Sequence, residues 1–148
     1  MVDCRHAQIS APAQGHRREN LVGIVLVSHS AELARGLTDI ARQVAGPEVR
    51  IEPAGGGPEG SLGTSGDLVH DAIEAADQGD GVVILCDLGS AILTVRHVLE
   101  GNGHGGSVRL VDAPLVEGAI AAAVVSAAAR PLEEVIQAAE EARGANKL

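Results

Sequence analysis

The sequence predicts an α/β fold of three layers, in which a four-stranded, mainly parallel sheet is covered by helices on both faces. Short apolar runs alternate with segments of helical periodicity from residue 21 onward, and this alternation is typical of βαβ units. The first run, residues 21–27 (LVGIVLV), is nearly continuous and rich in β-branched residues, as in strands that are buried on both faces. Because crossovers between parallel strands are right-handed, few topologies remain, and we expect the strand order 2-1-3-4.

Three further apolar runs complete the predicted sheet. Residues 81–87 (GVVILCD) are the strongest of them, residues 49–54 are weaker, and residues 107–112 form the fourth strand. Glycine, proline and polar residues separate these runs from the helical segments, as expected of loops. We therefore predict one domain over residues 21–148, a length that fits a single hydrophobic core.

Apolar residues at helical spacing predict the helices. In the first helix, positions i, i+4, i+7 and i+11 are Leu33, Leu37, Ile40 and Val44. We expect these residues to form its apolar face, and Gly46-Pro47 to end it. The second, third and last helices are marked by similar patterns, namely Val69, Ala72, Ile73 and Ala76; Ile92, Val95, Val98 and Leu99; and Leu132, Val135, Ile136 and Ala139.

Several helix ends are also predicted. Thr64 or Ser65 is expected to be the N-cap of the second helix, because a hydroxyl there accepts a hydrogen bond from a free backbone amide. An Ala-rich helix begins at Pro114 and runs to about residue 129. Pro131 is expected at the first position of the last helix, where its missing N–H costs nothing.

Composition excludes several classes of partner. With 20 Asp+Glu against 11 Lys+Arg the net charge is −9, which argues against DNA, RNA or an anionic membrane as the main partner. The absence of Phe, Tyr and Trp argues against base-stacking modules. No apolar stretch approaches the ~20 residues of a membrane-spanning helix. Because Cys86 lies inside an apolar run, we expect the reducing cytoplasm to be the compartment.

Residues 1–20 differ from the rest of the chain. They carry Pro12, Gly15 and scattered polar residues, and we expect a flexible N-terminal extension there. Cys4, His6 and His16 lie in this extension, but their spacing matches no zinc pattern. We therefore expect neither a metal nor a cofactor.

Two polar segments are predicted to meet where the sheet changes its direction of winding. In open α/β sheets, sites lie at the carboxyl ends of strands beside the switch point, here between the first and third strands. Ser28-His29-Ser30 follows the first strand and Asp87-Leu88-Gly89-Ser90 follows the third. Asp87 can bind one ring nitrogen of His29 and leave the other as a nucleophile. The pair is therefore a candidate site of phosphoryl transfer.

Hydroxyls and glycines near this pair are candidates for binding a phosphoryl group; they are Ser30, Thr64, Ser65, Gly89 and Ser90. A helix N-terminus favours an anion at the same place. Plainer interpretations remain open, since His29 can be an ordinary loop residue and Asp87 a helix cap. His70, His97 and His104 are expected to be solvated helix or loop residues.

Four motifs in this order resemble one family. They are V-S-H-S at 27–30, A-G-G with G-T-S at 54–65, D-L-G-S-A at 87–91 and A-P-L-V-E-G at 113–118. Together they resemble the phosphotransfer subunit of bacterial dihydroxyacetone kinase driven by the phosphoenolpyruvate phosphotransferase system, which is similar to mannose-type EIIA domains. The resemblance covers about residues 21–142.

The resemblance implies a function and partners. It implies that the phosphocarrier HPr phosphorylates His29 at Nε2, with Asp87 on Nδ1–H. The phosphoryl group then passes to ADP on the nucleotide subunit of the kinase, and from there to dihydroxyacetone on a third subunit. Alternatives are the EIIA component of a mannose-type sugar system, a ligand-binding module and a regulatory domain. The resemblance and the apolar segment 114–143 both indicate a homodimer.

Overall fold

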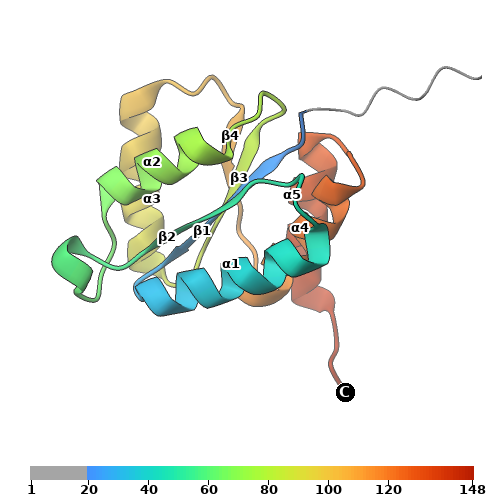
Figure 1. The fold of residues 1–148 in the computed structure, drawn as a ribbon, viewed down its shortest axis with the longest axis horizontal. Helices are drawn as coiled ribbons and strands as arrows, with labels where there is room; N and C mark the ends of the chain where they lie inside the picture. Colours follow the sequence, from blue (N-terminus) through green and yellow to red (C-terminus); the bar gives the residue numbers. More distant parts are fainter. Residues whose placement is uncertain (1–19) are drawn as a thin grey trace, which may run out of the picture.

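The computed structural model describes residues 20–148 (Figure 1), so the predicted extension over residues 1–20 and its Cys4, His6 and His16 lie outside the described residues except for Asn20. In chain order the elements are β1 (Gly23–Ser28), α1 (Ala31–Ala45), β2 (Ile51–Gly55), the 3₁₀ turn η1 (Pro58–Gly60), α2 (Gly66–Ala76), β3 (Val82–Cys86), α3 (Gly89–Asn102), β4 (Val108–Leu110), α4 (Leu115–Ala127), α5 (Leu132–Glu141) and the 3₁₀ turn η2 (Ala142–Gly144).

The sheet has the predicted topology. Its four strands follow the order β2-β1-β3-β4, and every neighbouring pair is parallel. Ile24 on β1 lies opposite Ile51 on β2 and Val83 on β3, so β1 is a central strand. All six residues of β1 and all five of β3 are buried, as the continuous apolar runs predicted.

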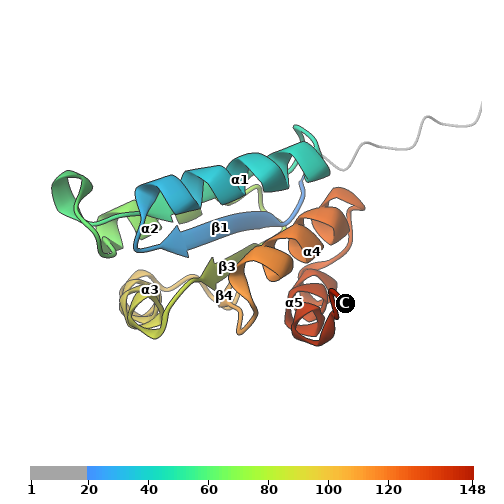
Figure 2. The same cartoon turned by 90° about the horizontal axis from the view of Figure 1, so that it is seen from below.

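Helices cover both faces of this sheet. On one face α1, α4 and α5 pack over Ile24 and Leu26 of β1, and on the other α2 and α3 pack over Val25 and Val27. Figure 2 shows α3 and α4 on opposite sides of β3 and β4. The alternation of β1 side chains between two apolar clusters confirms the predicted three-layer architecture.

The predicted apolar face of α1 is wrong in three of its four residues. Leu37 is buried, but Leu33, Ile40 and Val44 are about half exposed. The residues of α1 that face the sheet are Ala34, Leu37, Thr38 and Ala41. Small side chains at three of these positions let the helix approach the strands closely, and a pattern search that favours large apolar residues misses such a face.

The other helix faces agree with the sequence. The buried residues of α2 are the four predicted ones, and the apolar positions predicted for α3 and α5 are buried or partly buried. Ser65 is the N-cap of α2. Pro131 is the N-cap of α5 rather than its first helical residue, because its extended backbone (ψ 162°) precedes the helix. None of the described helices is long and apolar enough to cross a membrane.

Gly23 offers a test of the close packing between β1 and α2. A Cβ at this position would overlap the carbonyl oxygen of Ala76, the last residue of α2. We expect Gly23→Ala to lower the free energy of unfolding by at least about 2 kcal/mol, since backbone cannot yield as a flexible side chain does. Urea unfolding followed by far-UV circular dichroism measures this change.

Gly36 in α1 provides the matched control. A Cβ there meets nothing within 4 Å. Gly36→Ala should raise the free energy of unfolding by about 0.5–1 kcal/mol, because alanine has the higher helix propensity. Equal effects of the two substitutions would contradict the packing described for Gly23.

Candidate functional site

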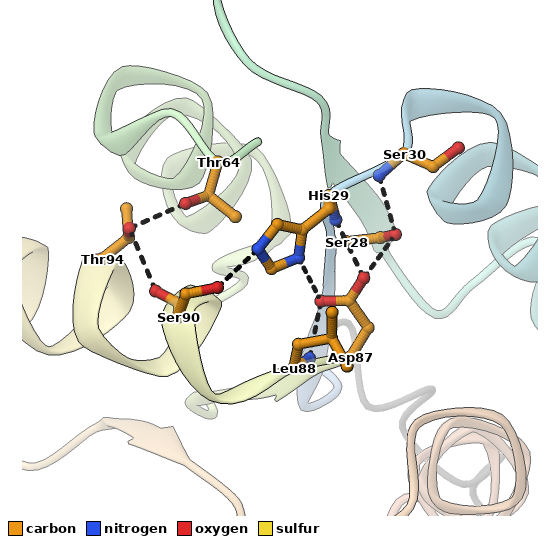
Figure 3. Close-up of polar contacts among 8 residues, drawn as sticks. All are labelled: Ser28, His29, Ser30, Thr64, Asp87, Leu88, Ser90 and Thr94. Carbon is orange, nitrogen blue, oxygen red and sulfur yellow. Dashed lines mark hydrogen bonds and ion pairs between the residues drawn. The ribbon is translucent and has the colours of Figure 1, made fainter. Parts of the chain in front are cut away.

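The candidate site lies at the carboxyl ends of the two central strands (Figure 3). His29 follows the last residue of β1, and Asp87 follows the last residue of β3. These strands are hydrogen-bonded neighbours, with Val27 opposite Cys86, so the two residues emerge side by side. The structure thus brings together the two residues that the switch-point argument paired.

Asp87 holds His29 by both its ring and its backbone. The Nδ1 atom of His29 lies 2.9 Å from Oδ1 of Asp87, and the backbone amide of His29 donates to Oδ2 at 2.9 Å. An ionised carboxylate can only accept, so Nδ1 carries the proton in this pair. The lone pair of the neutral ring is then on Nε2, which is the arrangement of a nucleophile.

Two further donors fix the Asp87 carboxylate. The hydroxyl of Ser28 donates to Oδ2 at 2.9 Å, and the amide of Leu88 donates to Oδ1 at 2.7 Å. Burial acts to raise the pKa of the Asp87 carboxyl, but the hydrogen bonds from His29, Ser28 and Leu88 outweigh it and lower the pKa below its ordinary value of 3.8. Asp87 is therefore an anion at neutral pH.

Ser28 belongs to this site although it was not among the predicted site residues. It is fully buried, and its hydroxyl also accepts a hydrogen bond from the amide of Ser30 at 3.1 Å. A signal was present in the sequence: a serine ends an apolar run that is buried on both faces, and a buried hydroxyl needs a partner. Its role is to orient the carboxylate of Asp87.

Ser90 lies on the opposite side of the imidazole. Its hydroxyl oxygen is 2.6 Å from Nε2 of His29. With the proton on Nδ1, the Ser90 hydroxyl is the donor and Nε2 the acceptor. Ser90 is exposed in the first turn of α3, so its side chain can rotate away when another group approaches Nε2.

The other predicted phosphoryl-binding residues take different places. The hydroxyl of Ser30 caps α1 and that of Ser65 caps α2, each by accepting a backbone amide hydrogen bond. Thr64 pairs with Thr94, hydroxyl to hydroxyl, at 2.8 Å. Among the five candidates, Ser90 therefore has the direct contact with His29. Gly89 is the first residue of α3.

Thr94 was missed by the sequence analysis. Its hydroxyl lies 2.8 Å from that of Thr64 and 3.4 Å from the carbonyl of Ser90, one turn earlier in α3. It thus joins the segment before α2 to the first turn of α3. The spacing of four residues from Ser90 was the available signal.

Helix N-termini give the site its electrostatic character. α1 begins at Ala31 and α3 at Gly89, directly after the two loops that carry the His–Asp pair. The N-cap residue of α3, Leu88, has no side-chain hydrogen bond to the helix. Free amides and the positive end of the helix dipole favour an anion here.

The glycine-rich loop between β2 and α2 is tied to the backbone of His29. The amide of Gly63 donates to the carbonyl of His29 at 3.0 Å, and the amide of Gly56 donates to the carbonyl of Ser28 at 3.1 Å. A Cβ on Gly55 would lie 2.7 Å from both the Cβ of Ala34 and the carbonyl oxygen of Ser30. Glycine at position 55 thus allows the loop to approach the start of α1.

Other reactive side chains lie apart from this pair. His70 and His97 line a pocket of about 350 Å³ between α2 and α3, and His104 lies in the loop before β4. Burial, and then the charge of Asp87, raise the pKa of the Cys86 thiol to about 12. The thiol therefore stays protonated at neutral pH and does not act as a nucleophile. Over residues 20–148 no group of three or more His, Cys, Asp or Glu could hold a metal ion.

Comparison with known proteins decides the family. The model of the family described as "PTS system fructose IIA component" (EIIA-man) matches residues 23–137, which span the sheet, the His–Asp pair and most of α5. The chain belongs to the mannose-type EIIA family. The family resemblance of the four sequence motifs is confirmed.

Curated relatives refine this EIIA assignment. The chain is 37% identical over 119 residues to the phosphoryl donor subunit DhaM of PEP-dependent dihydroxyacetone kinase 2 from Listeria innocua, covering 79% of this chain and 95% of that protein. It is also 37% identical to the DhaM subunit of Escherichia coli K12, covering 78% of this chain but 26% of that longer protein.

A solved structure confirms the fold. The crystal structure of EF1359, a protein described as of unknown function, superposes on the chain with a TM-score of 0.74. The two sequences are 34% identical, and the match covers 82% of this chain and 94% of that one.

The lowered pKa of Asp87 predicts how stability depends on pH. Because the folded pKa lies below 3.8, the carboxylate stabilises the fold fully above that value, and this stabilisation is lost as the pH falls through the folded pKa. Asp87→Asn removes the charge at every pH. The difference in unfolding free energy between wild type and variant should stay constant above about pH 5 and shrink in more acid solution. Urea unfolding at stepped pH measures it; a constant difference down to about pH 2 would contradict the hydrogen-bonded anion.

Proposed function

We propose that the chain is the phosphohistidine carrier of a phosphoenolpyruvate-dependent dihydroxyacetone kinase. In this proposal His29 takes a phosphoryl group from HPr and passes it to ADP on the nucleotide subunit of the kinase. That subunit then phosphorylates dihydroxyacetone on the third subunit. The observation that carries the proposal is the hydrogen-bonded pair of His29 and Asp87, in a chain similar to DhaM subunits over most of its length.

The first transfer takes place directly between two histidine rings. Nε2 of His29 attacks the phosphorus of the donor phosphohistidine, a phosphorus–nitrogen bond forms, and the bond to the donor ring breaks. The donor imidazole leaves with the electron pair. The ring of His29 becomes positively charged, and the Asp87 carboxylate, 2.9 Å from Nδ1, stabilises that charge.

The second transfer reverses these changes. A β-phosphate oxygen of ADP attacks the phosphorus, the bond to Nε2 breaks, and the ring returns to its neutral form. Transfers of this kind depend mainly on positioning and electrostatic stabilisation. Here the chain supplies a fixed ring, the Ser90 hydroxyl at 2.6 Å from Nε2 and the amides that begin α3. No step requires a metal or cofactor from this chain.

The cytoplasm is the compartment that we propose for this reaction. The buried thiol of Cys86 is free, and a high pKa keeps it protonated, which agrees with a reducing environment. The proposed partners HPr, the nucleotide subunit and the dihydroxyacetone subunit would meet the carrier there.

We further propose that the carrier is a homodimer. Val116 and Val124 on α4 are about half exposed, although this apolar helix also packs on α1 and α5. β4 pairs with β3 alone, so its other edge is unpaired over residues 20–148. A two-fold contact along α4 and β4 would cover both features.

Replacing His29 tests the proposed function directly. Incubation with phosphoenolpyruvate, enzyme I and HPr should label the wild type with acid-labile phosphate, and His29→Ala should abolish the label, because Nε2 is the nucleophile. The same mixture with the two kinase subunits should form dihydroxyacetone phosphate with wild type alone. Labelling without any triose phosphate would favour a regulatory role.

Two other histidines serve as controls. His70 and His97 lie between α2 and α3, and neither has a hydrogen bond to His29 or Asp87. His70→Ala and His97→Ala should keep the label and the kinase activity at wild-type levels. Label that persists in His29→Ala would sink the assignment. Label that disappears in either control would implicate that histidine in the transfer.

The dimer has its own test. Sedimentation equilibrium at micromolar concentration should give about twice the chain mass of 15.0 kDa. Interference optics are required, because the chain has no Trp or Tyr to absorb at 280 nm. Val124→Asp places a charge at the proposed contact and should shift the mass to that of one chain. A wild-type mass of 15.0 kDa would rule out the homodimer at this concentration.

A further inference from the structure

The hydroxyl of Ser90 forms a serine–histidine–carboxylate triad with the His–Asp pair (Figure 3). Oγ of Ser90 lies 2.6 Å from Nε2 of His29, and Nδ1 of the same ring lies 2.9 Å from Oδ1 of Asp87. One imidazole therefore joins a hydroxyl on one side to a carboxylate on the other, at hydrogen-bond distance on both sides. In this order of groups a serine becomes a nucleophile, because the ring takes the hydroxyl proton.

The hydrogen bonds of the triad leave the imidazole as a general base. Asp87 is an anion that accepts from Nδ1, so the proton of the neutral ring lies on Nδ1 and the lone pair on Nε2. Nε2 then accepts the hydrogen bond of the Ser90 hydroxyl. When that proton moves to Nε2, the positive charge of the ring lies beside the carboxylate, which stabilises it.

The first turn of α3 supplies donors for an oxyanion next to the serine. Ser90 is the second residue of α3. The amide of Ala91 donates to the carbonyl of Leu88 at 3.1 Å, but the amides of Gly89 and Ser90 have no acceptor within residues 20–148. Free amides at the positive end of a helix dipole favour the negative charge that forms when a carbonyl carbon is attacked.

Access and charge narrow the class of substrate. Ser90 and Leu88 are exposed, and 25% of the His29 side chain is exposed, so a small molecule can reach the hydroxyl from solvent. The segments 28–34 and 87–93 contain no Lys or Arg, and they carry the carboxylates of Glu32 and Asp87. Negatively charged substrates are therefore disfavoured. An uncharged ester with a good leaving group fits these conditions.

We propose that Ser90 is a nucleophile toward uncharged activated esters, with His29 as its general base and Asp87 orienting that base. Oγ attacks the carbonyl carbon while its proton passes to Nε2. The alcohol leaves with the electron pair of the broken carbon–oxygen bond and takes this proton, so that an ester remains on Ser90. Water then attacks this ester by the same route and releases the carboxylic acid. The activity belongs to the unphosphorylated chain and does not rest on the proposed function.

A fluorophosphonate tests the nucleophile. Its phosphorus accepts the serine oxygen, fluoride leaves, and an acid-stable phosphonate ester remains. Mass spectrometry of the intact chain and of its peptides should show one label, on Ser90. Ser90→Ala should remove the label, and His29→Ala should slow labelling by about 100-fold or more, as expected when a general base is lost. Far-UV circular dichroism checks that both variants are folded.

Ser107→Ala is the matched control. Ser107 is also exposed, but its hydroxyl donates to the backbone carbonyl of His104 at 2.8 Å rather than to a ring nitrogen. This variant should be labelled at the wild-type rate. Hydrolysis of p-nitrophenyl acetate should follow the same order, with wild-type turnover in Ser107→Ala and a loss of about tenfold or more in Ser90→Ala.

Three results would overturn the inference. They are the absence of label on the folded wild type, equal labelling of Ser90 and Ser107, and an acid-labile adduct on His29 in place of the serine ester. Wild-type ester hydrolysis by Ser90→Ala would also overturn it, because the ring itself would then be the nucleophile. Phosphorylation of His29 by HPr is a separate measurement, so the failure of the serine chemistry leaves the proposed function standing.

Discussion

The Asp87 carboxylate is the group on which the geometry of the site depends. It accepts hydrogen bonds from the hydroxyl of Ser28, the amide and ring of His29, and the amide of Leu88. These bonds join the segments that follow β1 and β3, and they fix the imidazole as one tautomer in one orientation. A carboxylate with four donors also stays ionised in a partly buried place, because the hydrogen bonds outweigh the cost of desolvation.

Close packing of small residues brings this carboxylate and its partners together. α1 lies near the sheet through Ala34 and Ala41, and Gly55 leaves room for the carbonyl of Ser30.

The fold was predictable from the sequence, but the buried face of α1 was not. Continuous β-branched runs predicted β1 and β3, since few other structures bury such runs on both faces. The face of α1 depends on which small residues meet the strands, and three large apolar residues of that helix point to water instead.

The positions of the two main site residues were predictable from the sequence, but the contacts of the surrounding hydroxyls were not. Strand order placed His29 and Asp87 at adjacent strand ends, because parallel strands end at the same edge of a sheet. It did not separate the hydroxyls that contact the histidine from those that cap helices. Ser30 and Ser65 each accept an amide of their own helix, whereas Ser90 reaches Nε2 and Ser28 reaches the carboxylate. These differences arise from side-chain directions at the start of each helix, which spacing alone does not determine.

The two sides of the imidazole differ in how strongly they are held, and this difference suits a carrier. Nδ1 faces a carboxylate fixed by three other donors, whereas the described hydrogen bond to Nε2 comes from one exposed hydroxyl, that of Ser90. A carrier must release the phosphoryl group that it accepts. Tight binding of that group in the phosphorylated carrier would therefore slow the second transfer. The two segments that carry the His–Asp pair, residues 28–34 and 87–93, accordingly contain no arginine or lysine that would form a strong ion pair with a phosphoryl group. Backbone amides at the start of α3 stabilise negative charge more weakly and without side-chain reorganisation. In the proposed function, His29 is thus a rigidly held nucleophile whose phosphoryl group is weakly bound, as reversible transfer between two partners requires.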